Sequence, residues 1–243
     1  PLSDVSRAPL RVAMSDAIAH RRKQLGKRLD LSKVAAHLPT GPDLSTYDPS
    51  RPDQLVAVVQ SYQPSDIPAL TKIAEAAEES WSIRPVADRV AVMRQTAALM
   101  REQRWDLAAW EVFEEGKPWR EADADVAEAI DFLEYYAGEM ARLDPPPRLG
   151  RYPGELNEVL WSPRGVTVVI APWNFPLAIP TGMVSAALVT GNPVLFKPSE
   201  RSSAMGYQLA QIMLDAGVPK GLLQYVPGGP QLGRELVASG VVK

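Results

Sequence analysis

The sequence contains no cysteine among its 243 residues. A disulfide and a cysteine-ligated metal are therefore excluded within these residues, and so is a cysteine nucleophile. Histidine is almost as scarce, because only His20 and His37 occur and they lack the paired spacing of a zinc motif. We expect no metal site in this chain, so its chemistry must depend on other side chains.

A long uninterrupted apolar run is also missing. The most apolar stretch, 165–196, is broken by prolines and glycines, so it does not predict a membrane span. The opening "PLSDVSRAPL" lacks the basic-then-apolar order of a signal peptide. A formal net charge of −3 argues against a nucleic-acid partner, because such partners need an excess of positive charge. We expect a soluble protein that is not exported and binds neither membrane nor nucleic acid.

The first half of the chain is dominated by helical patterns. Residues 1–63 predict an N-terminal arm with a strand near "LVAVVQ" (55–60), and residues 64–150 predict a helical region. Gly116-Lys117-Pro118 is a clear helix stop within this region. The helix that follows carries six carboxylates, which we expect to form a solvated face: Glu121, Asp123, Asp125, Glu128, Asp131 and Glu134.

The second half changes to short apolar runs. "GVTVVI" (165–170), "PVLFK" (193–197) and "LLQYV" (222–226) begin about thirty residues apart, which is the length of a βαβ unit. Runs that are apolar on both faces are typical of a parallel sheet covered by helices. We expect helices over 177–190, 203–216 and 230–240, with "VVK" (241–243) opening a fourth strand. The pattern predicts an α/β fold with a doubly wound parallel sheet.

Polar residues and glycines follow each predicted strand. The loops are "APWNFP", "KPSE" and "PGGPQLG", and ligands of such sheets bind beyond the carboxyl ends of the strands. Asn174 is either a donor to a developing oxyanion or a cap for the next helix. Lys197 and Glu200 either hold a ribose or form a surface ion pair, and the glycine loop either receives a phosphate or is a plain turn.

These residues resemble a known family. "VVIAPWNFPLAIPTGMVSAALVTGNPVLFKPSE" and "AGVPKGLLQYVPGG" are similar to the aldehyde dehydrogenase superfamily. "EEGKPWREADADVAEAIDFLEYYA" and "PLSDVSR" resemble one branch of it, the L-glutamate γ-semialdehyde (Δ1-pyrroline-5-carboxylate) dehydrogenases. Members of this branch act alone or as the C-terminal module of bifunctional proline utilisation proteins, and the resemblance covers essentially the whole chain.

The resemblance implies a set of site residues and NAD as the cofactor. Asn174 would be the catalytic oxyanion donor, and Phe175 and Glu134 would contact the aldehyde substrate. The cofactor-binding residues implied are Ile170, Ala171, Pro172, Trp173, Lys197, Ser199, Glu200, Gly229 and Gly233. Because the glycine loop is one residue shorter than the commoner family loop, Gly228 is an alternative to Gly229. A carboxylate at Glu200 would repel a 2′-phosphate, which favours NAD over NADP.

The resemblance also implies a domain plan, as follows: 1–63, an N-terminal arm; 64–150, the helical part of the cofactor-binding domain; 151–163, a hairpin strand used in oligomerisation; and 164–243, an incomplete Rossmann-type NAD-binding portion. The family's nucleophilic cysteine and general-base glutamate would lie downstream of Lys243. We therefore expect a truncated fold that is inactive alone, within a parent enzyme that oxidises the semialdehyde.

Two other functions remain open at this point. The parent protein could act on a different semialdehyde, or the chain could be a non-catalytic NAD-binding fragment. The expected partners are a small-molecule aldehyde, further copies of the chain, and a proline dehydrogenase module or protein. The resemblance places the protein in the cytoplasm, or in the mitochondrial matrix if it is eukaryotic.

Overall fold

The N-terminal region forms a helix and a small sheet. The computed structural model describes residues 3, 4 and 6–240. Helix α1 (Ala8–Arg22) precedes the short strand β1 (Lys27–Arg28), and an antiparallel hairpin follows, made of β2 (Asp43–Asp48) and β3 (Arg51–Gln60). Strand β1 pairs parallel with β3, so the sheet order is β1-β3-β2. The strand expected near 55–60 lies within β3.

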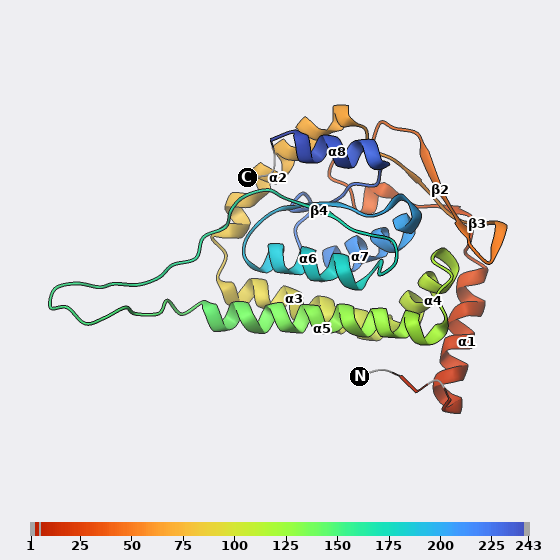
Figure 1. The fold of residues 1–243 in the computed structure, drawn as a ribbon, viewed down its shortest axis with the longest axis horizontal. Coiled ribbons are helices and arrows are strands. Elements are labelled where there is room, and N and C mark those ends of the chain that lie inside the picture. The colour runs from red at the N-terminus through yellow and green to blue at the C-terminus, as the bar shows by residue number, and fades with distance from the viewer. Residues whose placement is uncertain (1–2, 5, 241–243) are drawn as a thin grey trace.

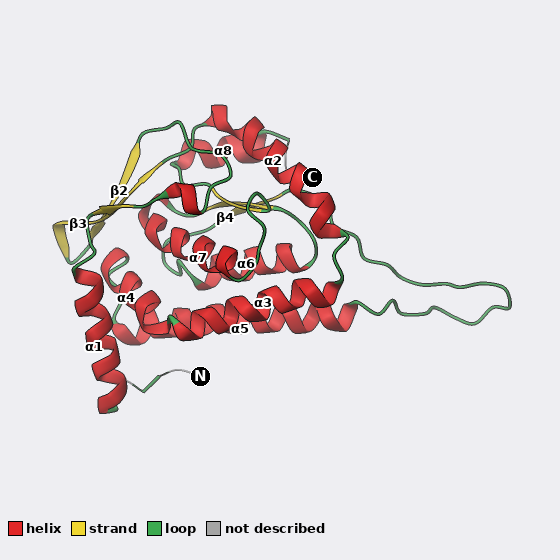
Figure 2. Cartoon of the chain, turned by 180° about the vertical axis from the view of Figure 1, so that it is seen from behind, coloured by secondary structure: helices red, strands yellow, loops and turns green. Residues whose placement is uncertain are grey.

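A helical region follows. It comprises α2 (Ile67–Ser82), α3 (Val86–Glu102), α4 (Arg104–Glu114) and α5 (Trp119–Leu143). The predicted helix stop is confirmed, because α4 ends before Gly116 and α5 begins after Pro118. Gly116 has a φ of 70°, a backbone conformation that favours glycine. Helices α3 and α5 lie side by side as a long outer layer (Figures 1 and 2).

The predicted parallel sheet is confirmed. Strands β4 (Thr167–Ile170), β5 (Val194–Lys197) and β6 (Leu223–Tyr225) are parallel and adjacent in the order β4-β5-β6. Helices α6 (Ala178–Val189) and α7 (Ser203–Asp215) connect them, and α8 (Pro230–Ala238) follows β6. These are the three helices expected from the pattern. The strand expected at 241–243 lies outside the described residues.

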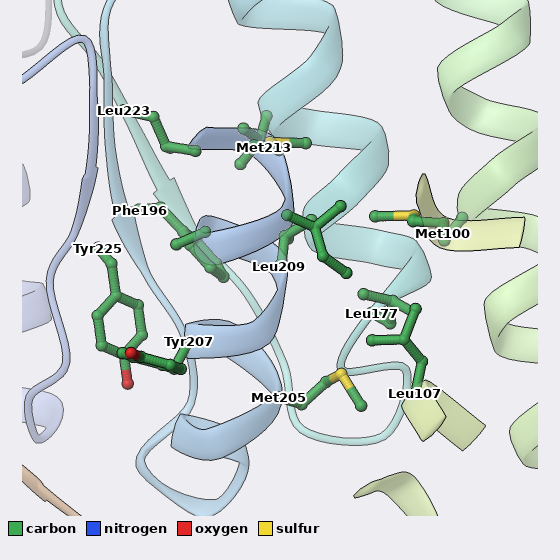
Figure 3. Packing of buried hydrophobic residues seen from close by; sticks show 14 of the residues in the cluster. Met100, Leu107, Leu177, Phe196, Met205, Tyr207, Leu209, Met213, Leu223 and Tyr225 are labelled. Atoms are coloured by element: carbon green, nitrogen blue, oxygen red, sulfur yellow. The ribbon is translucent and has the colours of Figure 1, made fainter. Parts of the chain in front are cut away.

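The layers around this sheet explain why its strands are apolar on both faces. Helices α6 and α7 also pack against α3, and α2 and α8 contact the sheet strands as well. Figure 3 shows α7 between strand residues, such as Phe196 and Tyr225, and the outer-helix residues Met100 and Leu107. All four of these side chains are buried. The sheet therefore forms the centre of the core, and its strand ends are fixed from two sides.

The expectation of a fully solvated acidic face on α5 is wrong for two residues. Asp123 and Asp125 are 1% and 0% exposed. Arg104 Nε lies 2.5 Å from Asp123 Oδ1, and Lys117 Nζ pairs with Asp125 Oδ2. A buried carboxylate is tolerated when a cation and hydrogen-bond donors surround it, and the fold supplies both here.

Residues 144–163 leave the body as a long two-armed excursion (Figure 1). Its arms pair where the Leu149 N–H donates to the Asn157 carbonyl at 2.8 Å and where Arg148 and Glu158 form an isolated antiparallel bridge. The strand expected at 151–163 is thus reduced to a single bridge. Several large apolar side chains of the excursion are exposed: Leu149, Tyr152, Leu156, Leu160 and Trp161. Within the described residues, no helix has the length and apolar character needed to cross a membrane.

Two helical glycines give opposite predictions for the same substitution. A Cβ on Gly206 in α7 would lie 2.8 Å from the Pro198 ring, whereas a Cβ on Gly138 in α5 would meet nothing within 4 Å. Gly206→Ala should lower the free energy of unfolding by about 1–3 kcal/mol through overpacking. Gly138→Ala should raise it by about 0.5–1 kcal/mol, because alanine is the better helix former. Urea unfolding of both variants checks this, and equal changes would contradict the tight packing of α7 on Pro198.

Candidate functional site

The three strand-end loops meet at one edge of the parallel sheet. The Ala171 N–H donates to the Lys197 carbonyl at 3.1 Å, and the Val226 N–H donates to the Phe196 carbonyl at 2.7 Å. A cavity of about 240 Å³ lies between the loops. Its lining residues are Ala171, Pro172, Lys197, Ser199, Glu200 and Pro230. The sequence expectation that these loops converge is confirmed.

An apolar cavity of about 470 Å³ adjoins the first, because Lys197 and Pro230 line both. Its other lining residues are Ile170, Gly233, Arg234, Val237 and Ala238. We call the two cavities together the strand-end groove. One part of this groove is polar and the other is flanked by α8, so it can take a ligand with a polar and a flat apolar portion.

Lys197 is buried in the wall of the strand-end groove. It is 5% exposed, and its Nζ donates to the Pro198 carbonyl at 3.1 Å. Burial lowers the pKa of Lys197, and the Glu200 carboxylate opposes this effect. The sequence left open a surface ion pair between these two side chains. The burial of Lys197 rules out that alternative. Glu200 is exposed, so its carboxylate is available to accept hydrogen bonds from a ligand.

The glycines of the third loop differ in what they face. A Cβ on Gly229 would lie 3.2 Å from Glu200 Oε2, and a Cβ on Gly233 would lie 3.4 Å from Lys197 Cε. A Cβ on Gly228 would instead collide with Leu232 Cδ2 at 2.3 Å. Gly229 and Gly233 thus face the strand-end groove, whereas Gly228 packs inward. Their missing side chains leave room for a ligand beside the first turn of α8.

Asn174 lies at the exposed turn between β4 and α6. Trp173, Asn174 and Phe175 are exposed, whereas Pro176 and Leu177 are buried. The alternative role of Asn174 as a helix cap is wrong, because α6 begins after Leu177 and has no cap from a side chain at that position. The Ala178 N–H donates instead to Asp125 Oδ1 at 2.7 Å. No protein hydrogen bond to the Asn174 side chain occurs among the described residues, so its amide can donate to a ligand.

Trp173 lines a different cavity from the strand-end groove. This neighbouring cavity of about 560 Å³ is also lined by Glu114, Glu115, Glu200 and Arg201. The Arg201 guanidinium lies 5.8 Å from the Trp173 ring centroid, and cation–π attraction stabilises that arrangement. Glu200 therefore lies between the two spaces. Of the predicted cofactor-binding residues, Trp173 shares its cavity with Glu200, whereas Lys197 and Ser199 line the strand-end groove.

The two glutamates of this second cavity have buried carboxyl groups, although Glu115 as a whole residue is only half-buried. Glu114 accepts hydrogen bonds from the Ala204 and Met205 N–H groups at 2.8 and 2.7 Å. Burial raises the pKa of Glu114 to about 7, although these two donors act against the rise. Burial also raises the pKa of Glu115 well above its usual range, with the neighbouring Glu114 carboxylate adding to the effect.

The two predicted substrate residues lie on different elements. Phe175 is 39% exposed beside Asn174, and the Lys117 ammonium lies 4.8 Å from its ring centroid. Glu134 is on α5, where its carboxylate lies 2.7 Å from Arg101 Nη2. Glu134 lines neither part of the strand-end groove. Phe175 thus lies in the same turn as Asn174, whereas Glu134 pairs with Arg101 of α3.

Sequence reasoning missed three residues that hold these loops: Glu114, Lys117 and Asp125. The sequence did hold a signal for the burial of Asp125. This residue falls between Ala122 and Val126 on the apolar stripe of α5. Glu114 likewise follows Leu107 and Trp110 on the buried side of α4. A carboxylate on an apolar helical stripe indicates an inward-facing acid whose partners come from elsewhere in the chain.

Comparisons with known proteins place the chain in a family. The sequence profile of the aldehyde dehydrogenase family matches residues 39–243. The chain is 38% identical over 238 residues to 1-pyrroline-5-carboxylate dehydrogenase 1 of Halalkalibacterium halodurans, a match that covers 98% of this chain and 46% of that protein.

Solved structures show the same likeness. A point mutant of Thermus thermophilus 1-pyrroline-5-carboxylate dehydrogenase aligns with a TM-score of 0.95 and 37% identity, over 100% of this chain and 47% of that one. A Thermus 1-pyrroline-5-carboxylate dehydrogenase with bound NAD aligns with a TM-score of 0.94 and 35% identity, over 100% and 48%. Proline utilization A of Bdellovibrio bacteriovorus aligns with a TM-score of 0.92 and 38% identity, over 97% of this chain and 25% of that one. The chain spans about half the length of the curated relatives it matches.

The raised pKa of Glu114 predicts a pH-dependent stability. The folded state holds the Glu114 proton up to about pH 7, whereas an unfolded glutamate releases it near its ordinary pKa of 4.5. The stabilisation is therefore complete below pH 4.5 and is lost as the pH rises to 7. A glutamine has no carboxyl proton to release, so Glu114→Gln does not lose this stabilisation. As the pH rises, the unfolding free energy of the parent should therefore fall relative to that of Glu114→Gln. The change should reach about 3 kcal/mol between pH 4.5 and 8.

Urea unfolding across this pH range measures the difference. Exposed Glu128→Gln on α5 is the matched control, and its difference from the parent should stay constant with pH. A constant difference for Glu114→Gln as well would rule out a buried proton on Glu114.

Proposed function

The chain belongs to the aldehyde dehydrogenase family, and we propose that the protein containing it oxidises L-glutamate γ-semialdehyde to L-glutamate with NAD. This reaction is the second step of proline catabolism. The observation that carries the proposal is the convergence of the Asn174, Lys197 and Glu200 loops at one sheet edge. Relatives named 1-pyrroline-5-carboxylate dehydrogenase support the choice of substrate.

The attacking thiol is not among these residues. Acyl transfer from an aldehyde needs an activated nucleophile, and the sequence has no cysteine. We therefore propose that the 243 residues are inactive alone and that a longer protein supplies the thiol. Within that protein, this chain would supply the cofactor site and the oxyanion donor.

The strand-end groove fits NAD in both of its parts. Its apolar cavity, between Ile170 and Val237, suits the flat face of an adenine. Lys197 and Glu200 offer a donor and an acceptor to the ribose hydroxyls, with Ser199 beside them. The missing Cβ atoms of Gly229 and Gly233 leave room for phosphate at the first turn of α8. Bound NAD would accept the hydride from the substrate.

Asn174 would act on the aldehyde oxygen. When a nucleophile adds to the carbonyl, negative charge develops on that oxygen, and an amide N–H that is already in place stabilises it. The turn between β4 and α6 presents this amide without another protein partner among the described residues. Phe175 would form part of the substrate pocket beside it. Glu134 is proposed to contact the substrate from α5, although its carboxylate is paired with Arg101 in this structure.

We also propose a homo-oligomer built through the cofactor domain and the excursion, whose exposed apolar side chains need a cover. The likeness to proline utilization A of Bdellovibrio bacteriovorus supports a proline dehydrogenase module or partner. The proposed location is the cytoplasm, or the mitochondrial matrix if the protein is eukaryotic.

The alternative function is NAD binding without catalysis, which the absence of cysteine favours. An aldehyde panel with NAD and the longer protein separates the two functions. NADH formation with a preference for the five-carbon amino acid semialdehyde is expected. A preference for another semialdehyde would change the substrate, and tight NAD binding without turnover would favour the alternative.

The Asn174 role predicts a selective loss of rate. Asn174→Ala in the longer protein should lower kcat about 100- to 1,000-fold, because one oxyanion donor is worth roughly 2.7–4 kcal/mol in the transition state. The Kd for NAD should change less than twofold, since the amide does not hold the cofactor. Steady-state kinetics and tryptophan fluorescence titration measure the two values. Equal losses in both would remove the oxyanion role.

The position of Glu200 predicts the cofactor preference. Glu200→Gln should improve NADP binding relative to NAD by about tenfold, or about 1.4 kcal/mol, because one negative charge near the 2′-phosphate is removed. Exposed Glu235→Gln on α8 is the control, because Glu235 lines neither part of the strand-end groove. Fluorescence titration with both cofactors checks the ratio. An unchanged ratio in Glu200→Gln would mean that Glu200 does not face the ribose.

A further inference from the structure

Three charged residues form a buried cluster at the corner between α4 and α5. Glu111 and Asp125 are both fully buried, and the Lys117 ammonium lies between them. Lys117 Nζ is 2.9 Å from Glu111 Oε2 and also pairs with Asp125 Oδ2. We call these three side chains the corner cluster. A buried set of this kind needs good geometry, because each charge has lost its water.

The corner cluster contacts the Asn174 turn at two points. Asp125 Oδ1 accepts the Ala178 N–H at 2.7 Å, at the start of α6. Lys117 Nζ lies 4.8 Å from the centroid of the Phe175 ring. Asn174 precedes these two contacts directly in the chain, and it has no protein hydrogen bond of its own among the described residues.

Other restraints on the turn are sparse. Its first residue, Ala171, is held by the Lys197 carbonyl at 3.1 Å. Its last residue before α6, Leu177, provides no side-chain cap for the helix. Without Asp125, the first N–H of α6 would be a buried donor with no acceptor, which is costly. Packing of the fully buried Leu177 anchors the end of the turn, and Asp125 of α5 supplies the acceptor for the first N–H of α6.

We propose that Asp125 and Lys117 are positioning residues that hold Asn174 in its catalytic orientation, by fixing the α6 start and the Phe175 ring beside it. This inference rests on the proposed oxyanion role of Asn174.

Asp125 interacts electrostatically with both other members of the corner cluster. Burial raises the pKa of Glu111 well above its usual range, and the nearby Asp125 adds to the rise. Burial lowers the pKa of Lys117, but Glu111 and Asp125 together raise it above its ordinary value. Asp125 also supplies negative charge to the positive end of α6.

Asp125→Asn breaks this arrangement with almost no change in shape. Lys117 and the Ala178 N–H contact different oxygens of Asp125. In asparagine one of these oxygens becomes an NH2 donor, which would face one of the two donors and cannot accept from it. Asp123→Asn is the matched control on the same helix. Asp123 is equally buried and also receives two donors, but these are Arg104 Nε at 2.5 Å and the Ser3 N–H at 2.7 Å, which lie outside the turn.

Hydrogen exchange tests the positioning without any need for catalysis. In the chain of 243 residues, Asp125→Asn should speed exchange of the amides in 174–181 about tenfold or more, as loss of a hydrogen bond to a charged group allows. Asp123→Asn should leave these amides within twofold of the parent. Equal exchange in the two variants would overturn the proposal. If Asp125→Asn does not fold, as judged by circular dichroism, Lys117→Met is measured in its place. It removes the cation beside the Phe175 ring while Asp125 still caps α6, so the amides of Asn174 and Phe175 should exchange faster than in Asp123→Asn, and equal exchange would overturn the proposal.

Kinetics of the longer protein test whether the positioning acts through Asn174. Asp125→Asn should lower kcat about 10- to 100-fold, with the Kd for NAD within twofold. In the Asn174→Ala background, Asp125→Asn should lower kcat less than twofold, because the amide that Asp125 positions is already gone. A merely structural role would lower kcat by the same factor in both backgrounds, and that result would overturn the proposal. An inactive parent would refute the proposed function instead, and hydrogen exchange alone would then decide whether the cluster holds the turn.

Discussion

Two carboxylates from the outer helices cap the two helices that cross over the parallel sheet. Asp125 of α5 accepts the Ala178 N–H at the start of α6, and Glu114 of α4 accepts two N–H groups at the start of α7. Neither helix receives a cap from the side chain at its own N-cap position. The first N–H groups of a buried helix must find acceptors, so both crossover helices depend on residues far away in the sequence. The outer helical layer therefore determines where α6 and α7 begin.

This capping fixes the loops at the carboxyl ends of β4 and β5. A crossover helix starts a few residues after its strand ends, so the helix start and the strand end together define the loop between them. The loop after β4 carries Asn174, and the loop after β5 carries Ser199 and Glu200. Because α4 and α5 meet at Gly116, a single corner supplies both caps. The two loops are thus positioned in part by one corner of the helical layer, although Ser199 also caps a short local turn after β5, where its Oγ accepts the Arg201 N–H at 3.2 Å.

The sequence could predict the sheet, its helices and the meeting of the loops, but not the buried carboxylates that cap the helices. The apolar runs, their thirty-residue spacing and the prolines after them predicted the sheet, the three helices and the meeting of the loops. The sequence pattern did not place Asp125 and Asp123 inside, because an acidic helix is usually solvated and their partners are distant. The Ala178 N–H lies 53 positions from Asp125 in the chain. Similarly, no local signal placed Trp173 in a different cavity from Lys197, because the side-chain directions within a proline-bounded turn depend on packing.

The use of charge at this corner has a physical reason beyond stability. Replacing a whole buried ion pair by apolar residues is often neutral for stability, so stability alone does not explain why charges occupy this corner. A carboxylate between a lysine and a helix N–H, however, tolerates few geometries, whereas apolar contacts allow the neighbouring helices to slide. The oxyanion role proposed for Asn174 would need that narrow geometry, because a misplacement of about 1 Å can cost a hundredfold in rate. Asn174 itself is exposed and has no other protein partner among the described residues, so its orientation must come from the backbone that carries it. The corner cluster contacts that backbone from the interior at Ala178 and beside the Phe175 ring, and it leaves the exposed Asn174 amide available to a ligand.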